Sequence, residues 1–222
     1  MKKKASKKIP KTKSIAEILK ENNQGIKLDI GCSGYKHKGF VGMDIRPEPG
    51  VDIVHNLEQF PYPLPDNSCS IILASHVLEH MNPASPDPKL TGLIDLLIEK
   101  KVITKKQAMD KFGEHHIFGT FLTMMDEFWR ILKVGGQLTF VVPYAGSPGF
   151  WQDPTHINPI NEATPMYFDP EHMSSFWFVY KPKPWMIELT EWNSNGVLEV
   201  VMSKRDIKPY EESIKHGTTY EA

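Results

Sequence analysis

The sequence predicts an α/β protein built on a mostly parallel sheet, and three observations support that class. Residues 27–30 form a run of strand length that leads directly into a turn containing Gly31 and Gly34. A second strand-like run, residues 40–45, ends in the carboxylate of Asp44. Two segments near the carboxyl terminus have the pattern of an antiparallel hairpin, so we expect the sheet to end in one.

The glycine turn and the carboxylate together indicate a nucleoside-binding site. Gly31 and Gly34 let the backbone turn sharply and approach a ligand closely, because glycine carries no Cβ. An acidic residue at the tip of the following strand, here Asp44, is how nucleoside-binding α/β sheets hold the two ribose hydroxyls. We therefore interpret residues 27–34 as the floor of a cofactor site.

Four blocks of sequence follow one another along the chain. They are Asp29-Ile30-Gly31-Cys32-Ser33-Gly34, then Asp44, then residues 65–80 ending in Val77-Leu78-Glu79-His80, and then residues 128–136. Together they resemble the class I S-adenosylmethionine-dependent methyltransferases over roughly residues 25–204, and among these a small, poorly characterised subgroup with a shortened first half. The resemblance implies a Rossmann-like seven-stranded sheet, mostly parallel with a C-terminal antiparallel hairpin, and S-adenosylmethionine as cofactor.

The connections in the first half are too short for the crossover helices that parallel strands normally need. Only residues 35–39 separate the glycine turn from the second strand, and residues 46–50 lead straight into a third strand at 51–55. We therefore expect the first crossover helices to be reduced to loops.

The middle of the chain predicts a helical insert at residues 83–117, after a fourth strand at 70–74. Three leucines at helical spacing mark its first half: Leu93, Leu96 and Leu97. Thr104 caps a second helix, whose Met109 and Phe112 share one face. We interpret the apolar stripe of the insert as core packing in preference to ligand contact.

The second half predicts, in chain order, a helix, a strand, a second helix and the two strands of the hairpin. They are expected at residues 118–133, 137–142, 162–178, 185–191 and 197–204. Gly135 and Gly136 follow the first of these helices and end it.

A single domain accounts for most of the chain. The 222 residues, of which 40% are hydrophobic, suffice for one core, which we place at residues 14–204. The domain opens with a short helix that has Ser14 as N-cap and Glu17 as its capping-box partner. Residues 1–13 carry seven lysines and are expected to be a disordered tail, and residues 205–222 are expected to be a C-terminal tail.

Charge and cysteine content narrow the setting of the protein. The net charge of -1 gives no general argument for a nucleic-acid partner. No stretch approaches membrane-spanning length, and two cysteines do not make a disulfide framework. We expect a cytoplasmic protein without membrane contact, and its oligomeric state is left open.

Ten residues are predicted to contact the cofactor. They are Asp29, Gly31, Cys32, Gly34, Asp44, Ile45, Asn56, Leu57, Ser75 and His76. The carboxylate of Asp29 suits the cofactor's ammonium group, but it also suits a turn-stabilising role without ligand contact. The amide of Asn56 suits the adenine amine, and the alternative for Asn56 is a plain turn residue.

Methyl transfer from a sulfonium requires positioning, exclusion of water and removal of a proton from the acceptor. We predict His156 as the general base, because imidazole titrates near neutral pH, and Asp153 as the residue that orients it. The alternative is that both are structural. His80 is the second candidate, beside Glu79. If His156 is the base, His156→Ala abolishes turnover while cofactor affinity stays nearly unchanged.

The acceptor is predicted only as a class. Aromatic residues suit a frame for a sugar or small aromatic acceptor, or else a seal for the core; they are Tyr144, Phe150, Trp151, Tyr167 and Phe168. We favour O-methylation of a small molecule or glycan. The N-terminal lysines keep a nucleic-acid acceptor open, and a catalytically silent S-adenosylmethionine-binding module is a third alternative.

Two other enzyme classes are disfavoured. His76-Val77-Leu78-Glu79-His80 spells the H-x-x-E-H of zinc metallopeptidases. We expect a helix to begin at Val77, but Pro83 interrupts it, so it is too short to hold both histidines. We therefore predict no bound metal. A nicotinamide dehydrogenase would need another glycine in the turn and room for a helix after it, and both are lacking.

Overall fold

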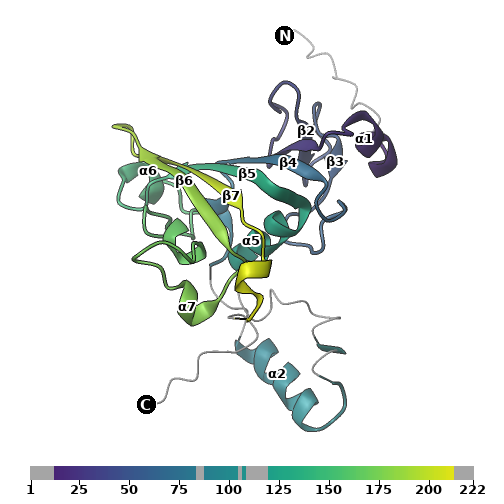
Figure 1. Ribbon diagram of the computed structural model, residues 1–222, viewed down its shortest axis with the longest axis vertical. Helices are drawn as coiled ribbons and strands as arrows, with labels where there is room; N and C mark the ends of the chain where they lie inside the picture. The colour runs from purple at the N-terminus through teal and green to yellow at the C-terminus, as the bar shows by residue number, and fades with distance from the viewer. Residues whose placement is uncertain (1–12, 84–87, 105–106, 109–119, 213–222) are drawn as a thin grey trace, which may run out of the picture.

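The computed structural model describes residues 13–83, 88–104, 107–108 and 120–212. The strands in this part are β1 (Ile26–Ile30), β2 (Val41–Asp44), β3 (Ile53–Val54), β4 (Cys69–Ser75), β5 (Leu132–Pro143), β6 (Trp185–Trp192) and β7 (Val197–Lys204). They form one seven-stranded sheet in the order β3-β2-β1-β4-β5-β7-β6. Figure 1 shows the hairpin of β6 and β7 on the side of the molecule away from β2 and β3. The pairs among β1 to β5 are parallel, whereas β7 pairs antiparallel with β5 and β6. The predicted mostly parallel Rossmann-like sheet with a terminal antiparallel hairpin is thus confirmed.

Helices and turns connect the strands. They are α1 (Ile15–Glu21), α2 (Pro88–Glu99), α5 (Thr120–Ile131), α6 (Pro148–Trp151) and α7 (Trp177–Tyr180), with the 3-10 turns η1 (Leu78–His80), η2 (Pro165–Phe168) and η3 (Lys208–Tyr210). α5 buries Met124, Phe128 and Ile131 in the same core as the central strands. α1 adds Ile18, which is 1% exposed. The core is therefore formed by the sheet together with α5 and α1.

The predicted start of α1 is confirmed in detail. The Ser14 hydroxyl accepts a hydrogen bond from the Glu17 backbone N–H at 3.3 Å. The Glu17 carboxylate accepts one from the Ser14 backbone N–H at 2.8 Å. This reciprocal pair is a capping box, and it satisfies two backbone donors that the first turn of a helix leaves without partners.

Loops connect β1 to β2 and β2 to β3, where the sequence predicted that the crossover helices would be reduced to loops. The loop after β1 and the loop after β2 meet at Gly42, in the middle of β2. A Cβ at Gly42 would lie 2.6 Å from Gly50 O and 2.7 Å from Cys32 Sγ, so only glycine fits. The Asp52 carboxylate accepts a hydrogen bond from the Gly42 N–H at 2.9 Å and pairs with Lys36, which ties both loops to the strand.

Two helix predictions were wrong. Residues 162–178 form η2 and α7 with an irregular segment between them. Pro170 has no N–H to donate, and the Asp169 side chain accepts from the Glu171 N–H at 3.0 Å, which stabilises a turn in place of a helix. The helix expected from Val77 is only the single turn η1, since the backbone at Met81 is extended. In addition, β5 begins at Leu132, earlier than the predicted residue 137.

The first helix of the predicted insert is present as α2, which lies apart from the sheet in Figure 1. Leu93 and Leu96 are 52% and 47% exposed, so at these positions the prediction of core packing was wrong. The Thr104 hydroxyl accepts a hydrogen bond from the Gln107 N–H at 3.1 Å, as expected for an N-cap residue. The predicted helical face at residues 109–112 and the tails at 1–12 and 213–222 lie outside the described residues. Within the described ranges, no helix is both long and apolar enough to cross a membrane.

The chain after β7 packs back onto the domain. Arg205 donates from Nε to Trp185 O at 3.0 Å and pairs with Asp169 at 3.2 Å. In η3, the Tyr210 hydroxyl donates to Glu171 at 2.7 Å. These contacts join the start of the predicted C-terminal tail to β6 and to the segment after η2.

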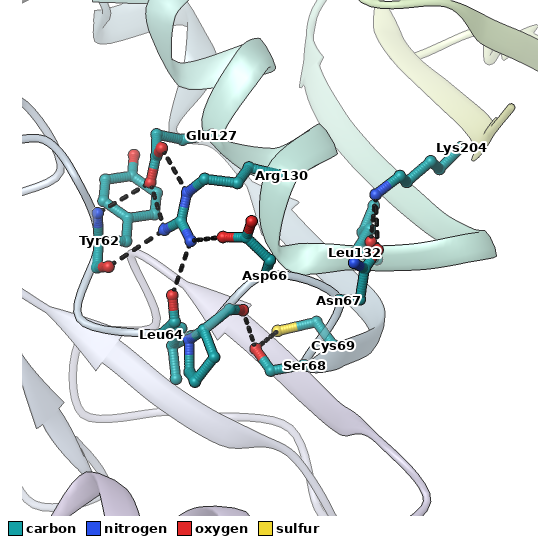
Figure 2. A network of polar contacts seen from close by, with 11 residues as sticks. Tyr62, Leu64, Asp66, Asn67, Ser68, Cys69, Glu127, Arg130, Leu132 and Lys204 are labelled. Carbon is teal, nitrogen blue, oxygen red and sulfur yellow. Dashed lines mark hydrogen bonds and ion pairs between the residues drawn. The ribbon is translucent and has the colours of Figure 1, made fainter. Parts of the chain in front are cut away.

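A polar network fastens the loop before β4 to α5. Figure 2 shows the Arg130 guanidinium between Glu127, Asp66 and the carbonyl groups of Tyr62 and Leu64. Nε and Nη2 of Arg130 lie 2.7 and 2.8 Å from the two Glu127 oxygens, which is a bidentate pair. One of these oxygens also accepts from the Tyr62 N–H at 2.8 Å. The network supplies hydrogen-bond partners to the backbone of a proline-rich segment, which cannot pair as a regular strand because proline has no N–H.

Lys204, at the end of β7, is buried in the same region. Its ammonium donates to Asn67 Oδ1 and to Leu132 O, both at 2.8 Å (Figure 2). The Nζ atom also lies 3.9 Å from the centre of the Trp129 ring. Burial lowers the pKa of Lys204 to about 8.

We expect Lys204 to make the protein more stable as the pH rises from about 8 to 10.5. The lysine pKa is near 10.5 in the unfolded chain and lower in the folded one, so the unfolded chain binds more protons in this window and loses them as the pH rises. Urea unfolding of the natural protein and of Lys204→Met, measured across this range, gives the effect as a difference. A difference that does not change with pH would contradict the expectation.

Candidate active site

The glycine turn after β1 combines a left-handed backbone at Gly31 with close packing against Val77. Gly31 has a φ of +65°, and its N–H donates to Met43 O at 2.8 Å. A Cβ at Gly31 would lie 2.5 Å from Val77 Cγ2. At Gly34 the nearest atom to such a Cβ is Pro49 O at 3.6 Å, an ordinary contact. Of the two glycines in this turn, Gly31 alone is required by space and backbone conformation.

Asp44, at the carboxyl end of β2, is held rigidly by this turn. The residue is 5% exposed. Its Oδ2 accepts from the Ser33 N–H at 2.9 Å, and its Oδ1 accepts from the Arg46 N–H at 3.0 Å. Each oxygen accepts one backbone hydrogen bond and retains capacity for another. The carboxylate is thus oriented by its own chain while remaining able to bind two hydroxyl groups.

A cavity of about 300 Å³ opens beside Asp44. Its lining comes from the ends of β2 and β3 and from η1, and consists of Asp44, Ile45, Asn56, Leu57, Glu58, His80 and Met81. The cavity thus brings together four of the predicted cofactor residues: Asp44, Ile45, Asn56 and Leu57. Glu58 and Met81 were not predicted, and their only signal in the sequence is that each adjoins a predicted residue. The cavity lies at the carboxyl ends of parallel strands, where open α/β sheets bind ligands.

The side chain of Asp29 is engaged within the protein. It is 3% exposed, and its Oδ2 accepts from the His37 N–H at 2.7 Å and lies 2.9 Å from His37 Nδ1. This geometry favours the turn-stabilising role for Asp29. Asn56 is similarly engaged, because its Oδ1 accepts from the Glu58 N–H at 3.0 Å. Contact of either residue with a cofactor stays a prediction.

Cys32 is part of the glycine turn and is buried. Burial raises the pKa of its thiol to about 12, and the neighbouring carboxylates of Asp29 and Asp44 add to this. Its Sγ lies 3.4 Å from Ser33 O, to which the thiol donates. The thiol is therefore a packing group and a poor nucleophile at neutral pH.

Ser75 and His76 stand where β4 ends. His76 has a φ of +55°, and its N–H donates to Val141 O at 2.8 Å. Its ring Nδ1 lies 3.2 Å from Glu79 Oε1. Because His76 precedes η1 and is not on a helix with His80, the helical metal-binding pair of a metallopeptidase is not formed.

The three predicted catalytic side chains are brought together at one place. The rings of His80 and His156 are 4.8 Å apart, centre to centre, and meet edge to face. Asp153 Oδ2 lies 3.7 Å from His156 Nε2, beyond hydrogen-bond distance. Asp153 instead accepts from the N–H and hydroxyl of Thr155 at 2.8 and 2.7 Å, which lowers the pKa of its carboxyl. Asp153 therefore makes no hydrogen bond to His156 in this geometry, and its orienting role stays a prediction.

Backbone hydrogen bonds hold the loop of His156 against η1. Glu79 O accepts from the N–H groups of Ile157 and Asn158, both at 2.9 Å. The Asn158 side chain, 4% exposed, donates to Leu78 O at 2.9 Å. Sequence reasoning missed Asn158, since nothing near it in the chain marks it as a partner of η1.

The predicted aromatic frame divides into core and surface. Phe150 and Phe168 are each 2% exposed and belong to the interior, so they fit the alternative of a seal for the core. Trp151 is 71% exposed, and the Tyr144 ring stacks on that of Trp192. Trp151 is thus the aromatic surface next to the loop of His156 that remains open to a ligand.

No family model and no curated protein matches the chain. It is similar to the solved structure of a SAM-dependent methyltransferase from Archaeoglobus fulgidus, at 16% identity and a TM-score of 0.43, over 86% of this chain and 95% of that one. It is also similar to the N-methyltransferase NodS from Bradyrhizobium japonicum WM9 in complex with S-adenosyl-l-homocysteine, at 11% identity and a TM-score of 0.44, over 86% of each chain. The cyclase SpnF matches at 12% identity and a TM-score of 0.44, over 86% of this chain and 79% of that one. With values this low, an assignment of function rests on the chain's own residues.

Proposed function

We propose that this protein is an S-adenosylmethionine-dependent methyltransferase. The observation that carries the proposal is the cavity of about 300 Å³ beside the glycine turn, lined by Asp44, Ile45, Asn56 and Leu57. The carboxylate of Asp44 suits both ribose hydroxyls, and the side chains of Ile45 and Leu57 suit the apolar adenine ring. The strand order and terminal hairpin agree with the fold that the sequence resemblance implies.

We propose further that the acceptor is a hydroxyl group of a small molecule or glycan. His80 lines the cavity and His156 packs against His80, which supports an imidazole as the group that takes the proton of an acceptor hydroxyl. The exposed face of Trp151 suits stacking against a sugar or an aromatic ring. A nucleic-acid acceptor depends on the N-terminal lysines, and unchanged RNA and DNA affinity at low salt after removal of residues 1–13 would exclude it.

Calorimetric titration with S-adenosylmethionine and S-adenosylhomocysteine tests the cofactor. We expect saturable binding of both, weakened a hundredfold or more in Asp44→Ala, because the variant loses two charge-assisted hydrogen bonds and each is worth about 1.5–3 kcal/mol. Asp206→Asn removes an exposed carboxylate near the other end of the sheet and should leave the affinity unchanged.

Circular dichroism and thermal unfolding must show that the Asp44 variant is folded, since Asp44 also accepts from the Ser33 N–H. Asp44→Asn, which keeps the side-chain shape, provides a second variant for the same titration. Well-folded natural protein that binds neither ligand would overturn the proposed function.

A further inference from the structure

Three side chains that are potential metal ligands converge at η1. They are Glu79 and His80, which are neighbours in the turn, and His156 from the loop after α6. One ligand atom from each of the three lies within 4.8 Å of the others. Two imidazoles and one carboxylate are a donor set that divalent transition metals accept readily.

The hydrogen bonds of His80 and His156 both engage Nδ1, so in each neutral ring Nε2 carries the free lone pair. His156 Nδ1 lies 2.8 Å from Phe150 O, which can only accept, so Nδ1 carries the proton and Nε2 is the acceptor in the neutral ring. His80 Nδ1 lies 3.1 Å from both Thr155 O and Thr155 Oγ1. Since the Thr155 hydroxyl donates to Asp153, His80 Nδ1 must also be the donor. A histidine that donates Nδ1–H to a carbonyl while Nε2 faces a cation is the usual arrangement in metal sites.

Glu79 supplies an oxygen that lacks a partner. The residue is fully buried, with 0% of its surface exposed. Oε1 lies 3.2 Å from His76 Nδ1, but Oε2 has no hydrogen-bond partner in the described structure. An unsatisfied buried polar atom costs about 1–3 kcal/mol, and more for a charged group, so a native protein retains one only with a compensating use.

We propose that Glu79, His80 and His156 bind one divalent transition-metal ion, with Glu79 Oε2 and Nε2 of each histidine as ligands. In a tetrahedral site with ligand distances of about 2.0–2.2 Å, neighbouring ligand atoms are roughly 3.4 Å apart. The ligand atoms of the three residues lie within 4.8 Å of one another, so the side chains must close by up to about 1.4 Å on binding. The Ile157 and Asn158 bonds to Glu79 O already hold the two segments together. Closure then requires side-chain rotation more than backbone movement.

The role of such an ion rests on the proposed function, although its binding does not. Three protein ligands leave at least one coordination position for water or a substrate oxygen. His80 also lines the cavity beside Asp44, so the open coordination position adjoins the proposed cofactor site. A metal ion held there would polarise an acceptor hydroxyl bound at that position. Metal binding uses the Nε2 lone pair of His156 that a general base would need, so the two roles exclude each other.

The test is titration of chelator-treated protein with zinc chloride, followed by calorimetry, with Co²⁺ absorption as an independent readout. We expect one zinc ion per chain and the visible bands of a four- or five-coordinate Co²⁺ site. Glu79→Gln and His156→Gln should each weaken zinc affinity about a hundredfold or more, because even loss of an outer partner costs 10- to 100-fold. His172→Gln, a histidine outside the cluster, should leave zinc affinity unchanged.

Zinc affinity that is equal in the natural protein and in a folded cluster variant would overturn the metal site. Absence of zinc binding would do the same, and would leave His156 available as a base. If Glu79→Gln fails to fold, the Co²⁺ spectrum and His156→Gln decide the question. Titration of the natural protein with S-adenosylhomocysteine is run separately without metal, so failure of the metal site and failure of the proposed function give different results.

Discussion

Arg130→Met should lower the free energy of unfolding by about 2–4 kcal/mol. The substitution leaves the Glu127 carboxylate, 8% exposed, without its bidentate cation, and it removes a donor from the carbonyls of Tyr62 and Leu64. The Arg130 side chain retains 27% exposure, which places the effect below that of a fully buried pair. Urea unfolding followed by circular dichroism measures the change.

Two variants of the same network separate its parts. Arg130→Lys keeps the charge but cannot donate to both Glu127 oxygens at once. Its free energy of unfolding should therefore fall by about half as much as that of Arg130→Met. Asp66→Asn should change stability by less than about 1 kcal/mol, because the Asp66 side chain is 71% exposed. If Arg130→Met proves no more destabilising than Asp66→Asn, the hydrogen bonds between Arg130 and Glu127 do not stabilise the fold.

Gly31→Ala should also destabilise the protein by about 2–5 kcal/mol. The left-handed conformation at a φ of +65° costs a non-glycine residue about 1–2 kcal/mol. A Cβ 2.5 Å from Val77 Cγ2 adds an overpacking cost of about 1–3 kcal/mol. Because the same turn presents the Ser33 N–H to Asp44, S-adenosylmethionine affinity should fall as well. Thermal unfolding and calorimetric titration of the variant measure the two effects.

Gly34→Ala is the matched control, since the two glycines belong to one motif. Its Cβ meets only Pro49 O at 3.6 Å, and its φ lies outside the left-handed region. We expect a stability change within about 0.5 kcal/mol of the natural protein. Equal losses in the two variants would show that the motif, and not the packing at Gly31, sets the requirement for glycine.

Local sequence was sufficient wherever the determining partners are near one another in the chain. Ser14 and Glu17 are three residues apart, and the capping box they form depends on nothing else. The closing hairpin is likewise specified by two alternating segments and the turn between them. Local patterns misled where a side chain competed with the backbone, as Asp169 does in the segment predicted to be a continuous helix.

The arrangement around η1 had no local signal. His80 and Thr155 are 75 residues apart, and their contact depends on where the loop after α6 crosses the ends of the strands. The sequence placed His156 and His80 in the same reaction but predicted no metal site. It did not indicate that Asn158 fastens the two segments or that Glu79 is fully buried.

The sequence by itself determined the strands, the hairpin, the glycine turn and the carboxylate of Asp44, because each follows from residue types within a few positions of one another. The tertiary structure alone decided that Gly31 and not Gly34 is confined by its neighbours, that Asp29 is used by His37, and that Glu79 Oε2 is left without a partner. The physical reason is that space, burial and free lone pairs depend on which distant segments meet. No pattern along the chain records that meeting.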